Sequence, residues 1–399
     1  MSTDIAHLAS RAVIVDHGRM KQRISVVLAL ATALLVGAPA AAHASPVSAQ
    51  SLRSAVDAAL TQRATKSHAG THVEITRRDG DSRAFGTAVL KSGSGTDDHP
   101  EGWLFLAERS GGAWKVALDG TTAFGDMAAE SGLLSVQERG AFTGGTVGVN
   151  AGSDFRTGMR LPFAVGQSWG MYGGPHPWGS SGAWSSLDLA GGDGRVLAAR
   201  GGTAYTMCKG WVRVIHDRGY STDYYHLFNN ISANGLAVGE GAFLGNQGTD
   251  VTCGGAATGA HVHFGLRQNS AYVGIAGHGI GKWAIENGGA AYQGSALHGS
   301  NRVYAGGGLY NYGALGFTQG VVDANGGGSL NKRSGPGTGY GVVGSVGDGA
   351  TVTISCSSYG TSHTGRYGTT NLWNRLSDGT WISDAFLWTG VNGTINGFC

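Results

Sequence analysis

The chain of 399 residues is long enough for two or three domains, and it contains 72 glycines while only 14% of its residues are charged. The glycines follow no collagen-like period and aromatic residues occur throughout, which excludes a collagen-like or disordered chain and is typical of turn-rich β structure. The net charge of +2 is too small to indicate a nucleic acid or a membrane surface as a partner.

The first 44 residues are predicted to be a secretory signal peptide. Residues 20–23 are a basic start, residues 24–36 form an apolar run too short to span a membrane comfortably, and the small residues around Ala44 suit cleavage. The short run disfavours the alternative, a membrane anchor. We expect translation to begin at Met20, cleavage after Ala44, and a secreted, extracellular protein without membrane contact after cleavage.

Residues 45–150 are predicted to form a small α+β unit. Apolar residues recur at helical spacing over residues 51–63, and four β-like runs follow, at residues 72–75, 84–90, 103–107 and 114–118. No cluster of histidines, cysteines or carboxylates is evident there. We interpret the unit as a pro-region that assists folding or covers an active site until removal; the alternative is an accessory domain that stays attached. The Gly-rich residues 140–152 are the predicted linker and maturation site.

Residues 151–312 are predicted to form an antiparallel all-β domain, because short β-like runs alternate with turns rich in glycine, and no convincing amphipathic helix is present. Residues 313–328 are the predicted Gly-rich linker to the last segment. The expected fold class is therefore mainly β, preceded by the α+β unit.

Residues 329–399 show short strands with turns every eight to twelve residues, which favours a small barrel. The Arg-Ser-Gly-Pro-Gly turn at residues 333–337 and the Trp-Ile-Ser strand at 381–383 resemble the bacterial SH3-like wall-binding domains. The resemblance implies a module that binds cell-wall peptidoglycan. Its aromatic residues either stack on peptide or sugar or form the barrel core, and both interpretations stay open: Tyr340, Tyr359, Tyr367 and Trp388.

The four cysteines are an even set in a chain predicted to be exported, where disulfides form. Three pairings are possible. The domain division favours the two pairings within domains, Cys208 with Cys253 and Cys356 with Cys399. Each bridge closes a loop of about 45 residues and stabilises the fold by about 4 kcal/mol in the chain-entropy model.

The central domain contains a set of residues suited to a metal site. His261 and His263 lie two apart in a β-forming run, so their side chains point to the same face of a strand. A catalytic zinc needs three protein ligands and an open position. One zinc ion per chain would be held by His176, Asp188 and His263.

Two further histidines are left for proton chemistry. His261 can take the proton from a zinc-activated water, and His226 can stabilise the oxyanion that forms when this water attacks the scissile carbonyl. The plainer alternatives are a chance pair on a solvated strand, a surface loop histidine at 176 and a capping carboxylate at 188. His216, at the end of an alternating strand, is expected to be structural.

Three motifs in order resemble the lysostaphin and β-lytic (staphylolytic) zinc metallopeptidase family over residues 155–304. They are residues 185–188 (Ser-Ser-Leu-Asp), 224–227 (Tyr-Tyr-His-Leu) and 258–264 (Thr-Gly-Ala-His-Val-His-Phe). The resemblance implies that His176, Asp188 and His263 bind zinc. It also implies a disulfide between Cys208 and Cys253.

The same resemblance implies that His261 is a catalytic base, that His226 stabilises the transition state, and that Tyr225 and Tyr292 line the substrate groove. Two departures stand out. The gap between His176 and Asp188 is longer than in many relatives, as in the β-lytic branch. Ala260 occurs where proline is expected, which affects loop stiffness more than chemistry.

The expected function is therefore a secreted zinc metalloendopeptidase, made as a zymogen and monomeric, that hydrolyses Gly-containing peptide bonds in bacterial peptidoglycan. Two alternatives remain. One is a non-catalytic wall-binding or regulatory protein that has lost its metal. The other is a general extracellular protease that acts on Gly-rich proteins.

Overall fold

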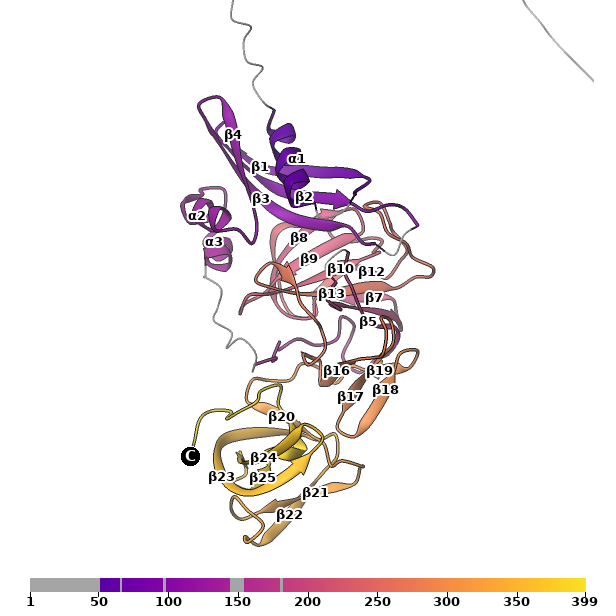
Figure 1. Cartoon of the computed structure of the whole chain (residues 1–399), viewed down its shortest axis with the longest axis vertical. Coiled ribbons are helices and arrows are strands. Elements are labelled where there is room, and N and C mark those ends of the chain that lie inside the picture. Colours follow the sequence, from indigo (N-terminus) through magenta and orange to yellow (C-terminus); the bar gives the residue numbers. More distant parts are fainter. Residues whose placement is uncertain (1–50, 65–66, 96–97, 144–153, 180–181) are drawn as a thin grey trace, which may run out of the picture. The chain divides into compact units, whose positions relative to one another are not determined.

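A computed structural model describes residues 51–64, 67–95, 98–143, 154–179 and 182–399 (Figure 1). The predicted signal peptide (1–44) lies outside these residues, as does most of the predicted maturation site. The fold is mainly β, as expected. No helix in the described part of the chain has both the length and the apolar character needed to cross a membrane.

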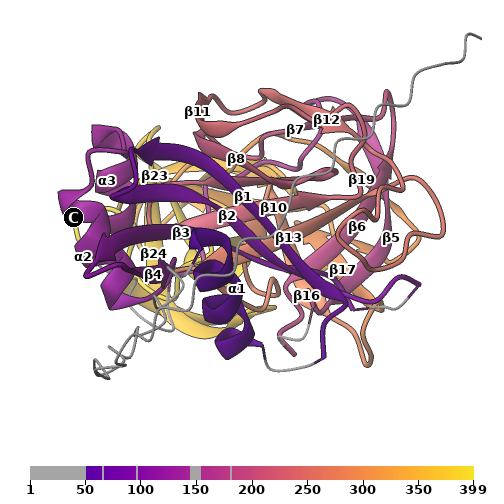
Figure 2. The same ribbon diagram turned by 90° about the horizontal axis from the view of Figure 1, so that it is seen from above.

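The N-terminal unit contains the predicted helix and all four predicted strands. Helix α1 (Leu52–Arg63) begins after Ser51, whose hydroxyl accepts a hydrogen bond from the backbone N–H of Ser54 at 3.1 Å. The strands form an antiparallel sheet in the order β1-β2-β3-β4, and Figure 2 shows β1, β2 and β3 side by side. Their bounds are β1 (Gly70–Asp79), β2 (Arg83–Lys91), β3 (Glu101–Ser110) and β4 (Ala113–Leu118). The helix packs on the sheet through its buried apolar face, Leu52, Ala55, Val56 and Leu60.

Two helices of this unit were not predicted, α2 (Thr122–Glu130) and α3 (Val136–Thr143). Both are short, and each includes a glycine, Gly125 or Gly140, which weakens the helical signal in the sequence. Helix α3 also takes up residues 140–143, the beginning of the predicted linker. Tertiary packing stabilises these helices, because Phe124 and Met127 of α2 are buried in a cluster with residues of the central domain.

The central domain is built on one antiparallel sheet in the order β11-β8-β9-β10-β13-β6-β5-β19, with β14 paired to β13. The strand bounds are β5 (Ser168–His176), β6 (Ser186–Gly191), β8 (Gly202–Cys208), β9 (Trp211–Ile215), β10 (Tyr220–Tyr225), β11 (Asn234–Val238), β13 (Val262–Gln268), β14 (Ala271–Tyr272) and β19 (Gly308–Tyr310). Two smaller sheets complete the domain, one of β7 (Arg195–Leu197) and β12 (Phe243–Asn246), the other of β15 (Gly279–Ile280), β16 (Trp283–Asn287), β17 (Gly294–His298) and β18 (Asn301–Tyr304). An apolar core that includes Leu187, Val212, Tyr224 and Phe264 fixes the sheet from which the candidate site projects.

The N-terminal unit and the central domain share a second apolar core. Phe85, Leu104 and Leu106 of the N-terminal sheet cluster with Trp178 and Trp211 of the central domain. The buried Arg213 adds a polar link, since its guanidinium donates to the carbonyl of Gly102 at 2.9 Å. The N-terminal unit is therefore packed against the central domain through buried surface.

The C-terminal part forms a seven-stranded sheet in the order β22-β21-β25-β24-β23-β20-β26, part of which is seen in yellow in Figure 1. Its elements are β20 (Gln319–Val322), β21 (Ser329–Arg333), β22 (Val342–Gly347), β23 (Thr351–Gly365), β24 (Gly368–Leu376), β25 (Trp381–Ser383), the 3-10 turn η1 (Asp384–Phe386) and β26 (Leu387–Trp388). The structure differs from the prediction at residues 313–328, because the predicted linker contains β20. Glycines surround this short strand, so the local sequence gives only a weak strand signal. Burial of Val321 and Val322 stabilises the strand in the sheet.

The aromatic residues of the C-terminal part divide between the two interpretations left open by the sequence. Tyr340, Tyr359 and Tyr367 are exposed, whereas Trp388 is only 8% exposed and packs in an apolar cluster. Both predicted disulfides are present, Cys208–Cys253 in the central domain and Cys356–Cys399 in the C-terminal part.

Candidate metal centre

The register of three neighbouring strands brings the predicted ligands together. In the pairing of β13 with β6, His263 lies directly opposite Asp188. On its other side β13 pairs with β10, where Tyr225 lies opposite His263 and His226 follows as the next residue. Residues that are far apart in the sequence therefore meet on one sheet because the strand register fixes them there.

His176 reaches the same place from the end of β5. The pairing of β5 with β6 shifts register between Met171 and Gly173 and again between Gly173 and His176. Such irregularities re-aim side chains at the end of a strand. They bring Nε2 of His176 to 3.5 Å from Oδ1 of Asp188, despite the long gap between these residues in the sequence.

The donor atoms of His176, Asp188 and His263 form a small triangle. Nε2 of His176 is 3.2 Å from Nδ1 of His263, and Nδ1 of His263 is 2.9 Å from Oδ1 of Asp188. A tetrahedral zinc ion with bonds of about 2.0–2.1 Å places its ligand atoms about 3.3–3.4 Å apart. Two nitrogens and one carboxylate oxygen at these separations fit a zinc ion and leave a fourth position open.

His261 and His226 lie beside the triangle, each held through Nδ1 by a backbone carbonyl. Nδ1 of His261 is 2.8 Å from the oxygen of Gly259, and Nδ1 of His226 is 3.0 Å from the oxygen of Asp250. In the neutral rings Nδ1 carries the proton that it donates, which leaves the Nε2 lone pair as the acceptor. Nε2 of His261 is directed towards the triangle, 3.5 Å from Oδ1 of Asp188.

Burial and charge set the protonation of these groups. Burial opposes ionisation of Asp188, but the charge of His176 and hydrogen bonds with His176 and His263 hold its pKa well below the usual value. Burial lowers the pKa of His263 far below its usual value, and the charge of His99 adds to the effect. Burial and then the charge of His261 lower the pKa of His226 to about 4. At neutral pH the carboxylate of Asp188 is thus ionised and the imidazole of His263 is neutral, as metal binding requires, and the imidazole of His226 is neutral as well.

The remaining predicted residues occupy different surroundings. The ring of Tyr292 stacks on His176 with centroids 4.1 Å apart, and the side chain is 40% exposed at the edge of the site. Tyr225 is fully buried and its hydroxyl donates to the carbonyl of Gly254 at 2.8 Å. His216 is structural, as predicted: it is buried, with Nδ1 3.0 Å from the oxygen of Gly201 and Nε2 2.8 Å from the Thr222 hydroxyl.

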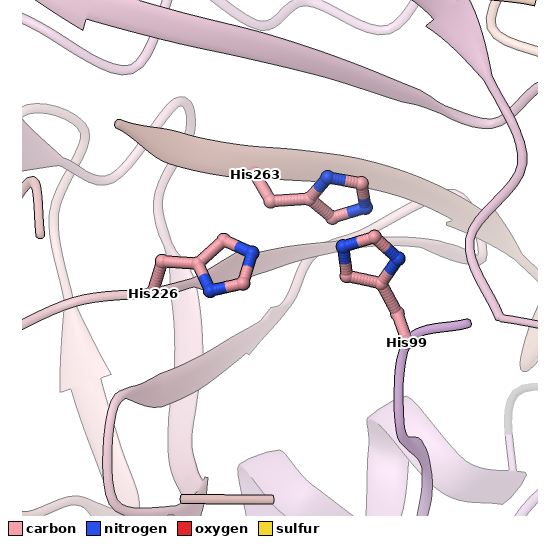
Figure 3. A group of neighbouring side chains, drawn as sticks. All are labelled: His99, His226 and His263. Atoms are coloured by element: carbon pink, nitrogen blue, oxygen red, sulfur yellow. The ribbon is translucent and has the colours of Figure 1, made fainter. Parts of the chain in front are cut away.

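One residue at the site was not predicted from the sequence. Figure 3 shows His99, from the segment between β2 and β3, beside His226 and His263. One ring nitrogen from each of these three histidines lies within 4.8 Å of the other two. The sequence around His99 holds no second histidine or cysteine at metal-ligand spacing, so no local pattern could have indicated its place.

Comparison with known proteins matches residues 184–275 to peptidase family M23. Protease LasA of Pseudomonas aeruginosa is 34% identical over 145 residues, which cover 34% of this chain and 35% of LasA. The beta-lytic metalloendopeptidase of Lysobacter enzymogenes is 31% identical over 147 residues, which cover 34% of this chain and 82% of that protein. Among solved structures, the M23 metalloprotease pseudoalterin from the deep sea is 32% identical; 38% of this chain and 97% of that chain are covered, with a TM-score of 0.35.

This chain thus spans only about a third of LasA but most of the Lysobacter metalloendopeptidase. The matched region includes Asp188, His226, His261 and His263, while His176 lies just before it. M23 enzymes are zinc-dependent metallopeptidases, in agreement with the donor atoms found here. The chain belongs to peptidase family M23.

Proposed function

We propose that the protein is a secreted zinc metalloendopeptidase that hydrolyses Gly-containing peptide bonds in bacterial cell-wall peptidoglycan. The observation that carries the proposal is the triangle of His176, Asp188 and His263, with His226 and His261 beside it. When bound, zinc acts as a Lewis acid that polarises a peptide carbonyl and lowers the pKa of a water molecule. The protein's own residues supply the rest of the chemistry.

His261 is the proposed general base. Its Nδ1–H is held by the carbonyl of Gly259, so the Nε2 lone pair faces the reacting atoms. The ring is 15% exposed, and water can therefore reach it. An imidazole in this position accepts the proton of the attacking water and returns it to the leaving amine.

His226 is the proposed stabiliser of the oxyanion. Its ring centroid is 4.7 Å from that of His261 and 6.0 Å from that of His263, so it borders the space where a peptide carbonyl must lie. Because Nδ1 already donates to the carbonyl of Asp250, Nε2 donates to the carbonyl oxygen only when the ring holds a second proton, and the negative charge that develops on that oxygen favours this imidazolium form. His226 has a φ of +67°, uncommon for a non-glycine residue, which is consistent with a constrained functional position.

Substrate contacts are proposed for Tyr292 and for the C-terminal part. Tyr292 stacks on His176 at the exposed edge of the site, where a peptide enters. The exposed tyrosines at 340, 359 and 367 are available to bind cell-wall peptide or sugar. This division of labour, with a cutting domain and a wall-binding module, follows the family resemblance of both parts. We further propose that residues 45–150 act as a pro-region and that the enzyme is a monomer.

The first experiment measures bound zinc in the purified chain and its cleavage of a pentaglycine peptide, before and after limited proteolysis. His263→Ala is expected to abolish both stoichiometric zinc and cleavage, because it removes one corner of the triangle. His363→Ala in the C-terminal part is the matched control and should retain both. A folded wild-type chain that binds no zinc and cuts no peptide in either form would overturn the proposal.

A second experiment separates wall hydrolysis from general proteolysis. Purified Gly-bridged walls and soluble elastin are digested in parallel at equal enzyme concentration. Clearing of the wall suspension with little release from elastin is expected. The opposite preference would replace the wall substrate with Gly-rich proteins and leave the zinc peptidase assignment intact.

A further inference from the structure

The segment between β2 and β3 pairs with the central domain next to the metal triangle. The backbone N–H of Ser92 donates to the carbonyl of Cys253 at 3.2 Å, and that of Gly255 donates to the carbonyl of Gly93 at 3.1 Å. Gly95 then donates to the carbonyl of Gly255 at 2.9 Å. Residues 92–95 therefore lie parallel to residues 253–255, in the way that an extended peptide adds to the edge of a protein.

The edge at residues 253–255 is shaped for close approach of a main chain. A Cβ atom on Gly254 would lie 2.1 Å from the carbonyl oxygen of Ser92, so only glycine permits this contact. The edge is also held firmly to the central domain. Cys253 is bonded to Cys208, and the carbonyl of Gly254 accepts a hydrogen bond from the Tyr225 hydroxyl at 2.8 Å.

Residues 98–100 lie at the site, and hydrogen bonds to the residues that follow His99 in the sequence hold this segment in place. The indole N–H of Trp178 donates to the carbonyl of Pro100 at 2.9 Å. Two residues later the carbonyl of Gly102 accepts from the buried Arg213. With hydrogen bonds on both sides, the His99 side chain is held at the site, and only 7% of the residue is exposed.

The His99 ring lies against two histidines of the candidate site. It stacks on the ring of His263 with centroids 3.9 Å apart and an angle of 10° between the planes, and it lies 5.6 Å from the ring of His226 (Figure 3). Ring lone pairs lie in the ring plane, so two stacked parallel rings cannot direct their nitrogens at one common ion. The three histidines are thus poorly arranged as a second metal site. The His99 ring fills space instead.

We propose that residues 92–95 and 98–100 occupy the substrate groove of their own chain and keep the peptidase latent, with His99 seated where the reacting carbonyl of a substrate would lie. The inference rests on the proposed function, because that function gives His226 and His263 their place at the reacting carbonyl. If residues 92–95 occupy the substrate groove, then residues 253–255 are the edge that pairs with an extended substrate. The occupying residues Ser92, Gly93, Ser94 and Gly95 are small, which suits a groove for glycine-containing peptides.

The test compares the intact wild-type chain with the intact His99→Ala variant through two measurements. The first is the rate of pentaglycine cleavage by the zinc-loaded chain. The second is the rate at which diethyl pyrocarbonate modifies His226 in the metal-free chain, mapped by mass spectrometry. We expect both rates to rise at least tenfold in the variant. His72→Ala, on strand β1 of the same unit, is the matched control and should behave as wild type.

A second variant keeps the proposal testable if His99→Ala fails to fold. Gly95→Pro removes the N–H that bonds to Gly255 and cannot adopt the φ of +75° found at Gly95, so it should release the segment without touching the histidines. The wild-type chain before and after proteolytic removal of the N-terminal unit gives the same comparison without substitution.

The outcomes separate the two proposals. Faster modification of His226 without peptide cleavage in any form would support the occlusion and overturn the proposed function. Unchanged modification of His226 in His99→Ala, in Gly95→Pro and after proteolysis would overturn the occlusion, whether or not peptide is cut.

Discussion

Gly173 lies directly opposite Asp188 in the pairing of β5 with β6, and a Cβ atom at residue 173 would lie 2.4 Å from Oδ2 of Asp188. The carboxylate that is expected to bind zinc therefore occupies space that any other residue at position 173 would fill. Because the contact is to a proposed ligand, this glycine couples the packing of two strands to the metal site.

Gly173→Ala is expected to weaken zinc binding at least tenfold, because the added methyl group displaces the Asp188 carboxylate from His263. Competition with a chromophoric chelator measures the affinity. Gly289→Ala is the matched control, since a Cβ there meets open space, and it should bind zinc like the wild type. Unchanged affinity in Gly173→Ala would show that Asp188 is not held by this contact.

The stability of the fold is expected to fall between pH 7 and pH 5, partly because of His216. Burial lowers the pKa of His216 to about 4, whereas the unfolded residue titrates near 6.5. Between these values the unfolded chain binds a proton that the folded chain does not, so acid favours unfolding. Protonation linked to His216 is expected to lower the free energy of unfolding by about 2 kcal/mol between pH 7 and pH 5.

Urea unfolding at the two pH values tests this expectation. In His216→Gln the decrease in the free energy of unfolding should be smaller than in the wild type by about 2 kcal/mol, since glutamine does not titrate. An equal decrease in wild type and His216→Gln would contradict the assignment of the buried neutral imidazole.

Asp223 compensates a buried guanidinium and should be important for stability. Its Oδ1 accepts from Nε of Arg213 and from the indole N–H of Trp211, both at 2.8 Å, and Oδ2 accepts from the Tyr272 hydroxyl at 2.8 Å. Neither side chain of the Arg213–Asp223 pair is exposed. Asp223→Ala leaves the buried arginine without its counter-charge, which is expected to cost about 3–5 kcal/mol.

Denaturant unfolding of Asp223→Ala measures this cost. Asp217→Ala is the matched control, because it also removes an aspartate from an ion pair with arginine, but Asp217 is 62% exposed. An exposed pair contributes about 0–1 kcal/mol. A similar decrease in the free energy of unfolding in the two variants would show that burial does not determine the strength of the Arg213–Asp223 ion pair.

The bridge from Cys356 to Cys399 is expected to stabilise the C-terminal part. It joins residues 43 positions apart and ties the end of the chain to β23. In the chain-entropy model such a loop contributes about 4 kcal/mol. Replacing both cysteines by serine should make the C-terminal part more sensitive to protease than the central domain, as limited proteolysis with mass spectrometry would show. Equal sensitivity in wild type and variant would exclude this contribution.

Much of the fold could be predicted from local patterns. The four strands and the first helix of the N-terminal unit lie where apolar periodicity places them, since burial of one face imposes that period. The within-domain pairing of all four cysteines is confirmed. Helices α2 and α3 and strand β20 escaped prediction, because their local signal is weak and contacts with distant residues stabilise them.

The sequence by itself determined that His261 and His263 lie on one face, because the side chains of a strand repeat every two residues, and it also showed the motifs that identify the family. Only the tertiary structure decided that His176 reaches Asp188 through irregular pairing of β5 with β6, and that Tyr225 is buried while Tyr292 is exposed at the site. The same holds for His99, which contacts His263 although 164 positions separate them in the sequence. Such a contact depends on how two folded units pack, and no local pattern in the chain encodes it.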